Sequence, residues 1–348
     1  MTSSSATKRL GFFTRLLDKA SAGERYRLAA EQIAHAERNG FDTAWVAQHH
    51  FHEAEGGLPS PLVFLSHVAA NTSRIRLGTG VITLPLEHPI RVAEDAAVLD
   101  LLAGGRLEIG VGTGGTPSSF TAFGHDSANR SEIFERYLAI VRDAWRGKPL
   151  EGGDALYPTA PSLDDRVWQA TFSHWGGARA GRAGDGLMLS RTQPRPETNP
   201  RATLSELQHP IIDAYLEALP QGREPRIMAS RTLFVADNRD EALRLAEQGL
   251  RKIVDQFAAK GHFIPGNDLS DIILALDTHV GTPEDVLESL SRDTALARAT
   301  DIVFQVHSVD PPHSYILRSI ELIASEVAPA LGWQKPAARS GKRVALVR

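Results

Sequence analysis

The sequence predicts a single α/β domain, a (β/α)8 TIM barrel with loop insertions. Short apolar stretches alternate with amphipathic stretches eight times along the 348 residues. Apolar strands that alternate with helices indicate a parallel sheet covered on both faces, and eight such units suggest a closed barrel, which typically needs about 250 residues. With 42% hydrophobic residues the chain can form a large core. We expect the barrel to occupy residues 1–335 and a basic tail to occupy 336–348.

Four strand–helix units are expected in the first half of the chain. Each strand is a short apolar run, and each helix shows apolar positions on one face or begins with a proline. The predicted strands are 9–13, 41–47, 75–84 and 106–112, and the helices are 23–40, 60–72, 88–105 and 132–145.

The second half repeats this scheme less regularly. Long loops are expected at 113–130, 147–164, 191–210 and 261–280. Long loops after barrel strands are where enzymes of this fold build their sites. The predicted strands are 166–172, 186–190, 226–236 and 301–306, and the helices are 177–184, 211–219, 239–261, 283–299 and 314–328.

Composition excludes several classes of function. The chain has no cysteine, which excludes disulfides, thiolate nucleophiles and iron–sulfur clusters. The net charge is −4 and no long basic block is present, so we expect no nucleic-acid partner. No window approaches the ~20 apolar residues of a membrane span, and the first ten residues lack an apolar signal core. A soluble, cytoplasmic protein is expected.

The glycine run "GRLEIGVGTGG" (105–115) contains the pattern G-x-G-x-x-G of dinucleotide-binding proteins. That pattern should follow the first strand and open a helix, with an acid at the end of the next strand. Here the run follows the fourth strand, "TPSSFTAFGHD" is expected to be a loop, and Glu132 lies in an amphipathic helix. We therefore interpret the glycines as room for a flat ligand or a tight loop.

A polar cluster follows the second predicted strand, in "AWVAQHHFHEAEGG" (44–57). His49 could act as an acid or hydrogen-bond donor at the rim of the barrel, since histidine titrates near neutrality. The His50-x-His52 spacing also suits a metal, with further ligands from Asp301, His307 or His313. Alternatively, these histidines only cap the loop.

A second informative stretch is "TFSHWGGARAGRAGDGLMLSR" (171–191). Ser173 and the pair Gly176 and Gly177 precede a predicted helix, and amides at a helix N-terminus bind anions. Arg179 and Arg182 add positive charge nearby. The stretch predicts a phosphate site, and a plain strand–turn–helix is the alternative.

Several segments together resemble the bacterial luciferase-like, flavin-dependent monooxygenase family. They are "AQHHFHE", "RIRLGTGVITLPLEHPIRVAEDAAVLDLLAGGRLEIGVGTG", "AGRAGDGLMLSR" and "HVGTPEDV", within a likeness that runs from about residue 9 to 330. "FSHWGG" and "DGLMLSRTQPRP" are most similar to an FMN-dependent subgroup. The resemblance implies a (β/α)8 barrel with reduced FMN, or in one branch the deazaflavin F420, at its C-terminal mouth.

The resemblance also implies roles for individual residues. His49 matches the family histidine near the reactive edge of the flavin, where it supports the C4a-oxygen adduct. A non-prolyl cis peptide is implied at Gly80–Val81. The cofactor-binding residues implied are Thr79, Gly80, Val81, Thr113, Ser173, Gly176, Gly177 and Ser190.

The chain differs from luciferase itself at three places. Gln48 stands where luciferase has an acid, Thr113 where it has an arginine, and glycines where it has paired threonines. These differences argue against light emission and an aldehyde substrate. Flavin binding is still expected, because backbone amides can replace side-chain donors.

We therefore predict a monooxygenase that uses reduced FMN, supplied by a separate flavin reductase, and O2 to oxygenate a small organic substrate. A homodimer is expected from the resemblance. Three alternatives stay open: an F420-dependent oxidoreductase, a non-catalytic flavin-binding barrel, and a metallohydrolase with metal at His50 and His52.

Overall fold

Eight parallel strands form a closed ring in the computed structural model, which describes residues 7–259 and 261–333. Neighbours in the ring follow one another along the chain, and the last strand pairs with both the first and β8, which closes the barrel. The predicted fold class is confirmed. The ring consists of β1 (Arg9–Thr14), β2 (Thr43–Val46), β3 (Arg76–Thr79), β5 (Leu107–Gly112), β6 (Val167–Ala170), β7 (Gly186–Leu189), β8 (Ile227–Val235) and β10 (Asp301–Gln305).

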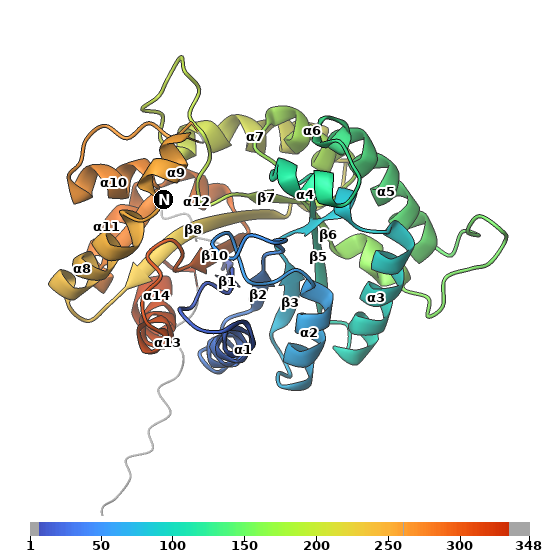
Figure 1. The fold of residues 1–348 in the computed structure, drawn as a ribbon, viewed down its shortest axis with the longest axis horizontal. Helices are drawn as coiled ribbons and strands as arrows, with labels where there is room; N and C mark the ends of the chain where they lie inside the picture. Colours follow the sequence, from blue (N-terminus) through green and yellow to red (C-terminus); the bar gives the residue numbers. More distant parts are fainter. Residues whose placement is uncertain (1–6, 260, 334–348) are drawn as a thin grey trace, which may run out of the picture.

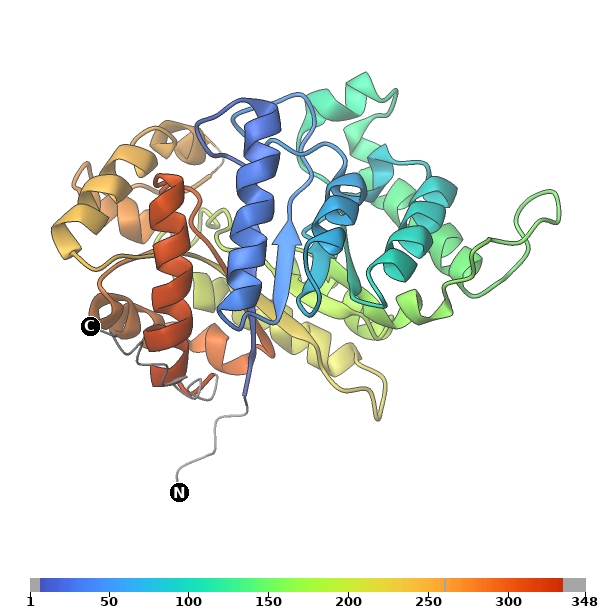
Figure 2. The same cartoon turned by 90° about the horizontal axis from the view of Figure 1, so that it is seen from below.

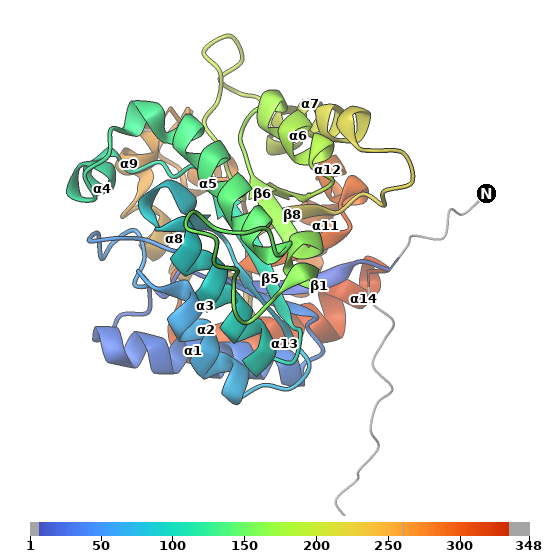
Figure 3. The same cartoon turned by 90° about the vertical axis from the view of Figure 1, so that its right-hand side faces the viewer.

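Helices surround the ring on its outside (Figure 1). Helices α1 (Ala22–Arg38) and α13 (His313–Leu322) lie side by side (Figure 2). Helix α6 (His174–Arg182) packs against α7 (Leu204–Ala218) (Figure 3). The main helices are α1 (Ala22–Arg38), α2 (Pro61–Ala70), α3 (Pro89–Leu102), α5 (Arg130–Trp145), α6 (His174–Arg182), α7 (Leu204–Ala218), α8 (Arg239–Leu250), α11 (Pro283–Ser291), α12 (Thr294–Arg298) and α13 (His313–Leu322).

Shorter elements fill the connections. Strand β9 pairs with the second half of β8, along the same edge that pairs with β7 in the first half. Thr232 of β8 shows this arrangement, because it pairs with β9 on one side and with β10 on the other. The short elements are β4 (Ile82–Thr83), β9 (Thr278–Gly281), α4 (Pro117–Ala122), α9 (Val254–Ala259), α10 (Leu269–Ala275), α14 (Ala328–Ala330) and η1 (Leu84–Leu86), η2 (Ser127–Asn129), η3 (Pro161–Arg166) and η4 (Ile323–Val327).

Local chemistry explains where helices begin. Thr282 caps α11 and Asp285 returns the bond to the cap, a capping box opened by proline. Thr203 and Glu206 form a second capping box, so α7 begins seven residues before the predicted start at 211 and contains Pro210 in its interior. The predicted loop after the glycine run was wrong in part, since Pro117 opens the six-residue helix α4.

The predicted strand 75–84 is divided into β3 and β4, and the peptide bond between Gly80 and Val81 is cis, as the resemblance implied. The glycine run at the end of β5 is explained by close contacts. A Cβ on Gly110 would lie 2.0 Å from the carbonyl oxygen of Thr79, and Gly114 has a φ of +76°. The run lies within a closed ring, where no dinucleotide fold is formed.

Two tryptophans fill the barrel interior. The rings of Trp45 and Trp168 meet edge to face with centroids 5.8 Å apart. Glycines opposite them provide the space, because a Cβ on Gly78 would lie 2.2 Å from Trp45 and one on Gly186 would lie 2.1 Å from Trp168. The barrel is thus a packed core rather than a pore, and its mouth has a solid floor.

No helix in the described part of the chain is long and apolar enough to cross a membrane. The predicted tail 336–348 lies outside the described residues, as do residues 334 and 335 of the predicted barrel.

Candidate active site

The alternation of side chains along each strand decides which residues face the barrel interior. Phe13, Trp45 and Val303 belong to one buried cluster inside the ring, while their immediate neighbours pack outward against the helices. Carrying this alternation beyond the strand ends places Arg15, His49 and His307 on the interior side, at the mouth. The C-terminal ends of all eight strands meet there because the strands are parallel.

The floor of the mouth is apolar. Ala47, Val81, Ala170 and Met188 lie in or against the interior cluster. On the side of β3, β5 and β6 these residues are small, and a Cβ on Gly112 would come within 2.8 Å of Val81 Cγ2. Small apolar side chains over three adjacent strands leave room for a flat ring system.

His49 is half-buried and lies three residues after the end of β2. Its backbone amide donates to the carbonyl of Leu58 at 3.0 Å. Its ring lies against Gly56, since a Cβ there would be 2.5 Å from Nδ1. The segment between Phe51 and Gly57 therefore holds this imidazole in place by close packing.

The other two histidines of the cluster contact α4 and the residue that follows it. The ring of His50 stacks edge-on against Phe123 at 4.9 Å, and burial lowers the pKa of His50. His52 Nε2 lies 2.9 Å from Ser118 Oγ. Asp301, once considered as a further ligand, starts β10 at the opposite end of the barrel and pairs with Arg9. Among the described residues, no group of three potential ligands could hold a metal ion.

His313, another ligand considered for that metal, lies on the outer layer. It begins α13 and its Nδ1 lies 3.1 Å from Gln32 Nε2 of α1.

Gln48 points outward rather than into the mouth. Its Oε1 accepts from the amide of Thr83 at 2.7 Å, and its Nε2 donates to Glu87 at 2.5 Å and to the carbonyl of Pro59 at 3.0 Å. Burial raises the pKa of Glu87, and the bond from Gln48 opposes that shift. The amide at this position therefore ties β2 to the β4 connection.

The predicted phosphate turn lies at the N-terminus of α6. Ser173 is exposed and caps the helix, with its Oγ accepting from the amide of Gly176 at 3.1 Å. A Cβ on Gly177 would lie 2.5 Å from the carbonyl oxygen of Ile211, so close packing against α7 explains this glycine. Arg179 packs on Phe134 at 4.6 Å and on Trp175 at 5.3 Å, and its Nε donates to Gln169 Oε1 at 2.8 Å.

The remaining predicted cofactor residues lie at the same end of the barrel. The hydroxyl of Thr79 is buried and bonds to both the amide and the carbonyl of Gly110, at 2.9 and 2.8 Å. Thr113 is half-buried after β5, and Ser190 is half-buried after β7. Thr79 can therefore contact a ligand only through its backbone, while Thr113 and Ser190 directly follow the mouth ends of their strands.

On the far side of the mouth, sequence reasoning named His307 only as a possible metal ligand and missed the two arginines near it, Arg15 and Arg191. His307 Nδ1 lies 2.5 Å from Asp310 Oδ1, and Arg191 donates to Thr232 Oγ1 at 3.0 Å. Arg15 donates to the carbonyl of Glu55. Each arginine or histidine here follows a strand by one or two residues, which is the signal that could have found them.

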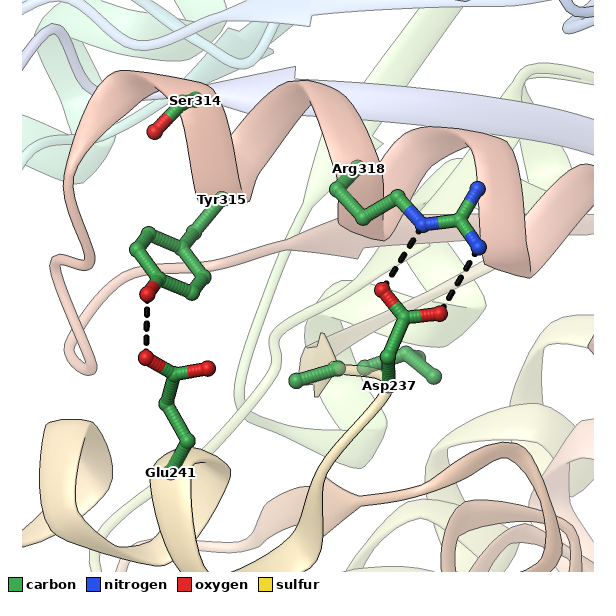
Figure 4. A pocket seen from close by; sticks show the side chains of 7 residues that line it. Asp237, Glu241, Ser314, Tyr315 and Arg318 are labelled. Atoms are coloured by element: carbon green, nitrogen blue, oxygen red, sulfur yellow. Dashed lines mark hydrogen bonds and ion pairs between the residues drawn. The ribbon is translucent and has the colours of Figure 1, made fainter.

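A cavity of about 140 Å³ lies between α8 and α13 on the outside of the barrel (Figure 4). Its charged side chains are satisfied internally. Arg318 binds Asp237 through two hydrogen bonds of 2.9 and 2.7 Å, and the hydroxyl of Tyr315 donates to Glu241. Nothing in this arrangement is directed toward a ligand.

A larger cavity of about 540 Å³ lies at the opposite end of the barrel from the mouth, where Glu108 binds Arg76 at 2.7 Å and Asp301 binds Arg9 at 2.7 Å. Charged networks at this end of a barrel serve stability. The mouth is therefore the candidate active site.

The chain is similar in sequence to a known protein family and to several known proteins. The family description "luciferase-like monooxygenase" matches residues 10–299. An uncharacterized protein of Sinorhizobium fredii is 29% identical over 342 residues, which cover 92% of this chain and 95% of that protein. A 4-hydroxyprotoasukamycin monooxygenase of Streptomyces nodosus is 29% identical over 309 residues, covering 83% and 82%.

Solved structures share the fold. The monooxygenase RslO1 of Streptomyces bottropensis is 25% identical with a TM-score of 0.75, covering 93% of this chain and 99% of that chain. The oxygenating constituent of a Pseudomonas putida 3,6-diketocamphane monooxygenase, in complex with FMN, is 19% identical with a TM-score of 0.77 over 93% and 99%. An F420-dependent reductase of Methanopyrus kandleri is 20% identical with a TM-score of 0.64 over 93% and 99%. The chain belongs to the luciferase-like monooxygenase family.

Proposed function

We propose that the protein is the oxygenase component of an FMN-dependent monooxygenase, which oxygenates a small organic substrate with O2. A separate reductase would supply the reduced flavin. Two monooxygenase comparisons support this proposal: the 29% identical relative from Streptomyces nodosus, and the FMN complex of similar fold.

The small residues at the mouth support a flavin as the cofactor. The isoalloxazine would lie over the small residues of β3, β5 and β6, including Gly80, Gly112 and Ala170, with Val81 and Met188 beneath it. The phosphate would lie at the N-terminus of α6, where the helix dipole and the Ser173 cap favour an anion. Thr113 and Ser190 would contact the part between them.

The chain's own residues would serve two roles. The bound reduced flavin supplies the electrons that activate O2. The apolar floor keeps water from the reacting centre, which prevents wasteful decay to peroxide. His49 donates a hydrogen bond or a proton from its imidazole at the border between the small-residue half of the mouth and β1. The observation that carries this assignment is the position of His49 two residues after Ala47, which belongs to the interior cluster. The alternation continued from β2 therefore directs His49 to the interior side.

The test mixes the purified protein and photoreduced FMN with air-saturated buffer and follows hydrogen peroxide. Wild type should slow peroxide release relative to free FMN, and His49→Ala should release it faster at unchanged FMN affinity. Equal behaviour of the two proteins would remove His49 from the mechanism. Binding titrations with F420 and with FMN test the alternative cofactor. Tighter binding of F420 than of FMN would replace the proposed reaction by an F420-dependent one.

We also propose a homodimer through α2 and α3, which pack against each other. Four large apolar side chains are exposed on them: Val63 at 73%, Val98 at 46%, Leu101 at 65% and Leu102 at 68%. Sedimentation of the wild type should give twice the mass of one chain, and Leu101→Glu should give the monomer. A wild-type monomer would contradict this. The cytoplasmic location stays a prediction.

A further inference from the structure

The mouth has two chemically different halves. Strands β2, β3, β5 and β6 contribute mostly glycine, alanine and valine, whereas the adjacent strands β7, β8, β10 and β1 end in polar side chains. The polar half consists of Arg15, Arg191, Thr232, His307 and Ser308. Its centre lies across the ring from β5, and it meets the small-residue half proposed for the flavin at β7, where Ser190 precedes Arg191.

Arg191 is buried without an acidic partner. Only 7% of it is exposed, and its guanidinium donates to two neutral hydroxyls, Thr232 Oγ1 at 3.0 Å and Ser308 Oγ at 3.3 Å. No carboxylate oxygen of the described residues forms an ion pair with it at 4.0 Å or less. Removing an unpaired cation from water is costly, so such groups are normally paired.

Arg15 repeats this arrangement beside it. Its guanidinium donates to the carbonyl of Glu55, and it too has no ion pair with an acid in the described part of the chain. The nearby acids are engaged elsewhere: Asp310 with His307 at 2.5 Å, and Asp277 with Arg195 at 2.6 Å. Burial, and then the charge of Arg15, lower the pKa of Arg191 to about 9.

Arg231, the other buried arginine among the described residues, is paired differently. Arg231 is fully buried, and its Nε lies 2.5 Å from Asp293 Oδ2. The buried arginine with a structural role, Arg231, is thus paired with a carboxylate. Among the described residues no carboxylate forms such a pair with Arg191, and the charges of Asp310 and Asp277 only partly offset its burial. This difference leaves the guanidinium of Arg191 available to a bound anion.

Buried polar atoms without partners at the same strand ends also indicate a bound ligand. His307 Nε2, Gln305 Oε1 and Gln193 Oε1 are buried and have no hydrogen-bond partner among the described residues. The three side chains belong to residues that are only 1%, 4% and 5% exposed. His307 and Gln305 follow Val303 on the interior face of β10. Buried polar atoms are normally satisfied, so these atoms require a ligand with polar groups or bound water.

We propose that the polar half of the mouth binds a carboxylate of the substrate through Arg191 and Arg15, with His307 Nε2 bonded to a neighbouring polar atom of the same molecule. The planar guanidinium fork matches the two oxygens of a carboxylate. That the ligand is the substrate depends on the proposed function. A phosphate shares this chemistry, and the experiment distinguishes the two.

The test uses calorimetry on the flavin-free full-length protein at low salt, with benzoate as probe and benzamide as its neutral match. Benzoate should bind and benzamide should not. Arg191→Gln should weaken benzoate binding about ten- to a hundredfold, since it removes a charged hydrogen-bonding partner. Arg244→Gln, an exposed change on α8, should leave it unchanged. FMN affinity, measured by fluorescence, should be the same in both variants.

Three outcomes would overturn the proposal. Equal benzoate affinity in wild type and Arg191→Gln would show that no such subsite exists. Tighter binding of inorganic phosphate than of benzoate, or loss of FMN affinity in Arg191→Gln, would assign the site to a phosphate. If Arg191→Gln does not fold, Arg15→Gln provides the same comparison. If FMN binds neither the wild type nor the variants while benzoate binds as expected, the proposed monooxygenase function is refuted and the carboxylate subsite is still supported.

Discussion

The imidazole of His49 lies against the α-carbon of Gly56 so closely that a methyl group on Gly56 would come within 2.5 Å of Nδ1. The same methyl group would lie 3.2 Å from the carbonyl oxygen of Arg15. One glycine therefore lets the loop after β2 fold over both the proposed catalytic histidine and the end of β1. This contact connects the local backbone to the chemistry proposed for the mouth.

Gly56→Ala is expected to displace His49 and so to mimic His49→Ala in part. Peroxide release from reduced FMN in air should be faster than in wild type, while FMN affinity is retained. Gly23→Ala is the matched control, because a Cβ at Gly23 meets nothing within 4 Å. If both alanine variants release peroxide at the wild-type rate, the position of the His49 ring does not affect peroxide release, which contradicts this prediction.

Ser173→Ala should weaken both the protein and its cofactor site. Loss of an N-cap hydroxyl costs about 1 kcal/mol of stability, and the phosphate proposed at α6 would lose its ordered turn. Thr203→Ala removes the cap of α7 and serves as control. Urea unfolding should show similar losses in the two variants, but FMN fluorescence titration should show weaker binding only in Ser173→Ala. Equal FMN affinities would place the phosphate elsewhere.

Two buried arginines should respond differently to removal. Arg231→Met leaves Asp293 buried without its partner, and breaking a buried pair in this way costs about 3–5 kcal/mol. Arg191→Met removes a cation that has no acidic partner, so the loss should be smaller, about 1 kcal/mol or less. Urea unfolding of the ligand-free variants measures both. A loss at Arg191 as large as that at Arg231 would indicate that Arg191 is structural.

The pair of Asp293 with Arg231 also predicts a dependence of stability on pH. Although burial opposes it, Arg231 lowers the pKa of Asp293 from 3.8 to about 2. The unfolded chain therefore binds this proton first as the pH falls. The stabilisation, about 2 kcal/mol, is fully present above pH ~4 and is lost between pH ~4 and ~2.

The urea midpoint at pH 5 and at pH 3 tests this dependence. Wild type should lose more stability between these values than Asp293→Asn, which has no carboxylate to protonate. Asp164→Asn, a change at an ion pair with a half-buried acid and a partly exposed arginine, is a useful second comparison. Parallel pH profiles for wild type and Asp293→Asn would contradict the assignment.

Much of the fold was accessible from local patterns. All eight ring strands were predicted within a few residues, because apolar runs and helix caps depend on neighbours along the chain. The start of α7 and the helix α4 were missed, since Thr203 and Pro117 were not recognised as helix starts. The position of His49 followed from its place after a strand, whereas the outward direction of Gln48 did not.

The sequence by itself determined the alternation of strands and helices and the family, and it predicted the end of the barrel at which function is proposed, because strand direction and side-chain periodicity are properties of short segments. Only the tertiary structure decided that Arg15, Arg191 and His307 share one half of the mouth. These residues are up to 292 positions apart, and they meet because β10 pairs with β1 and β8. Ring closure is a long-range event, and no local pattern records which side chains it brings together.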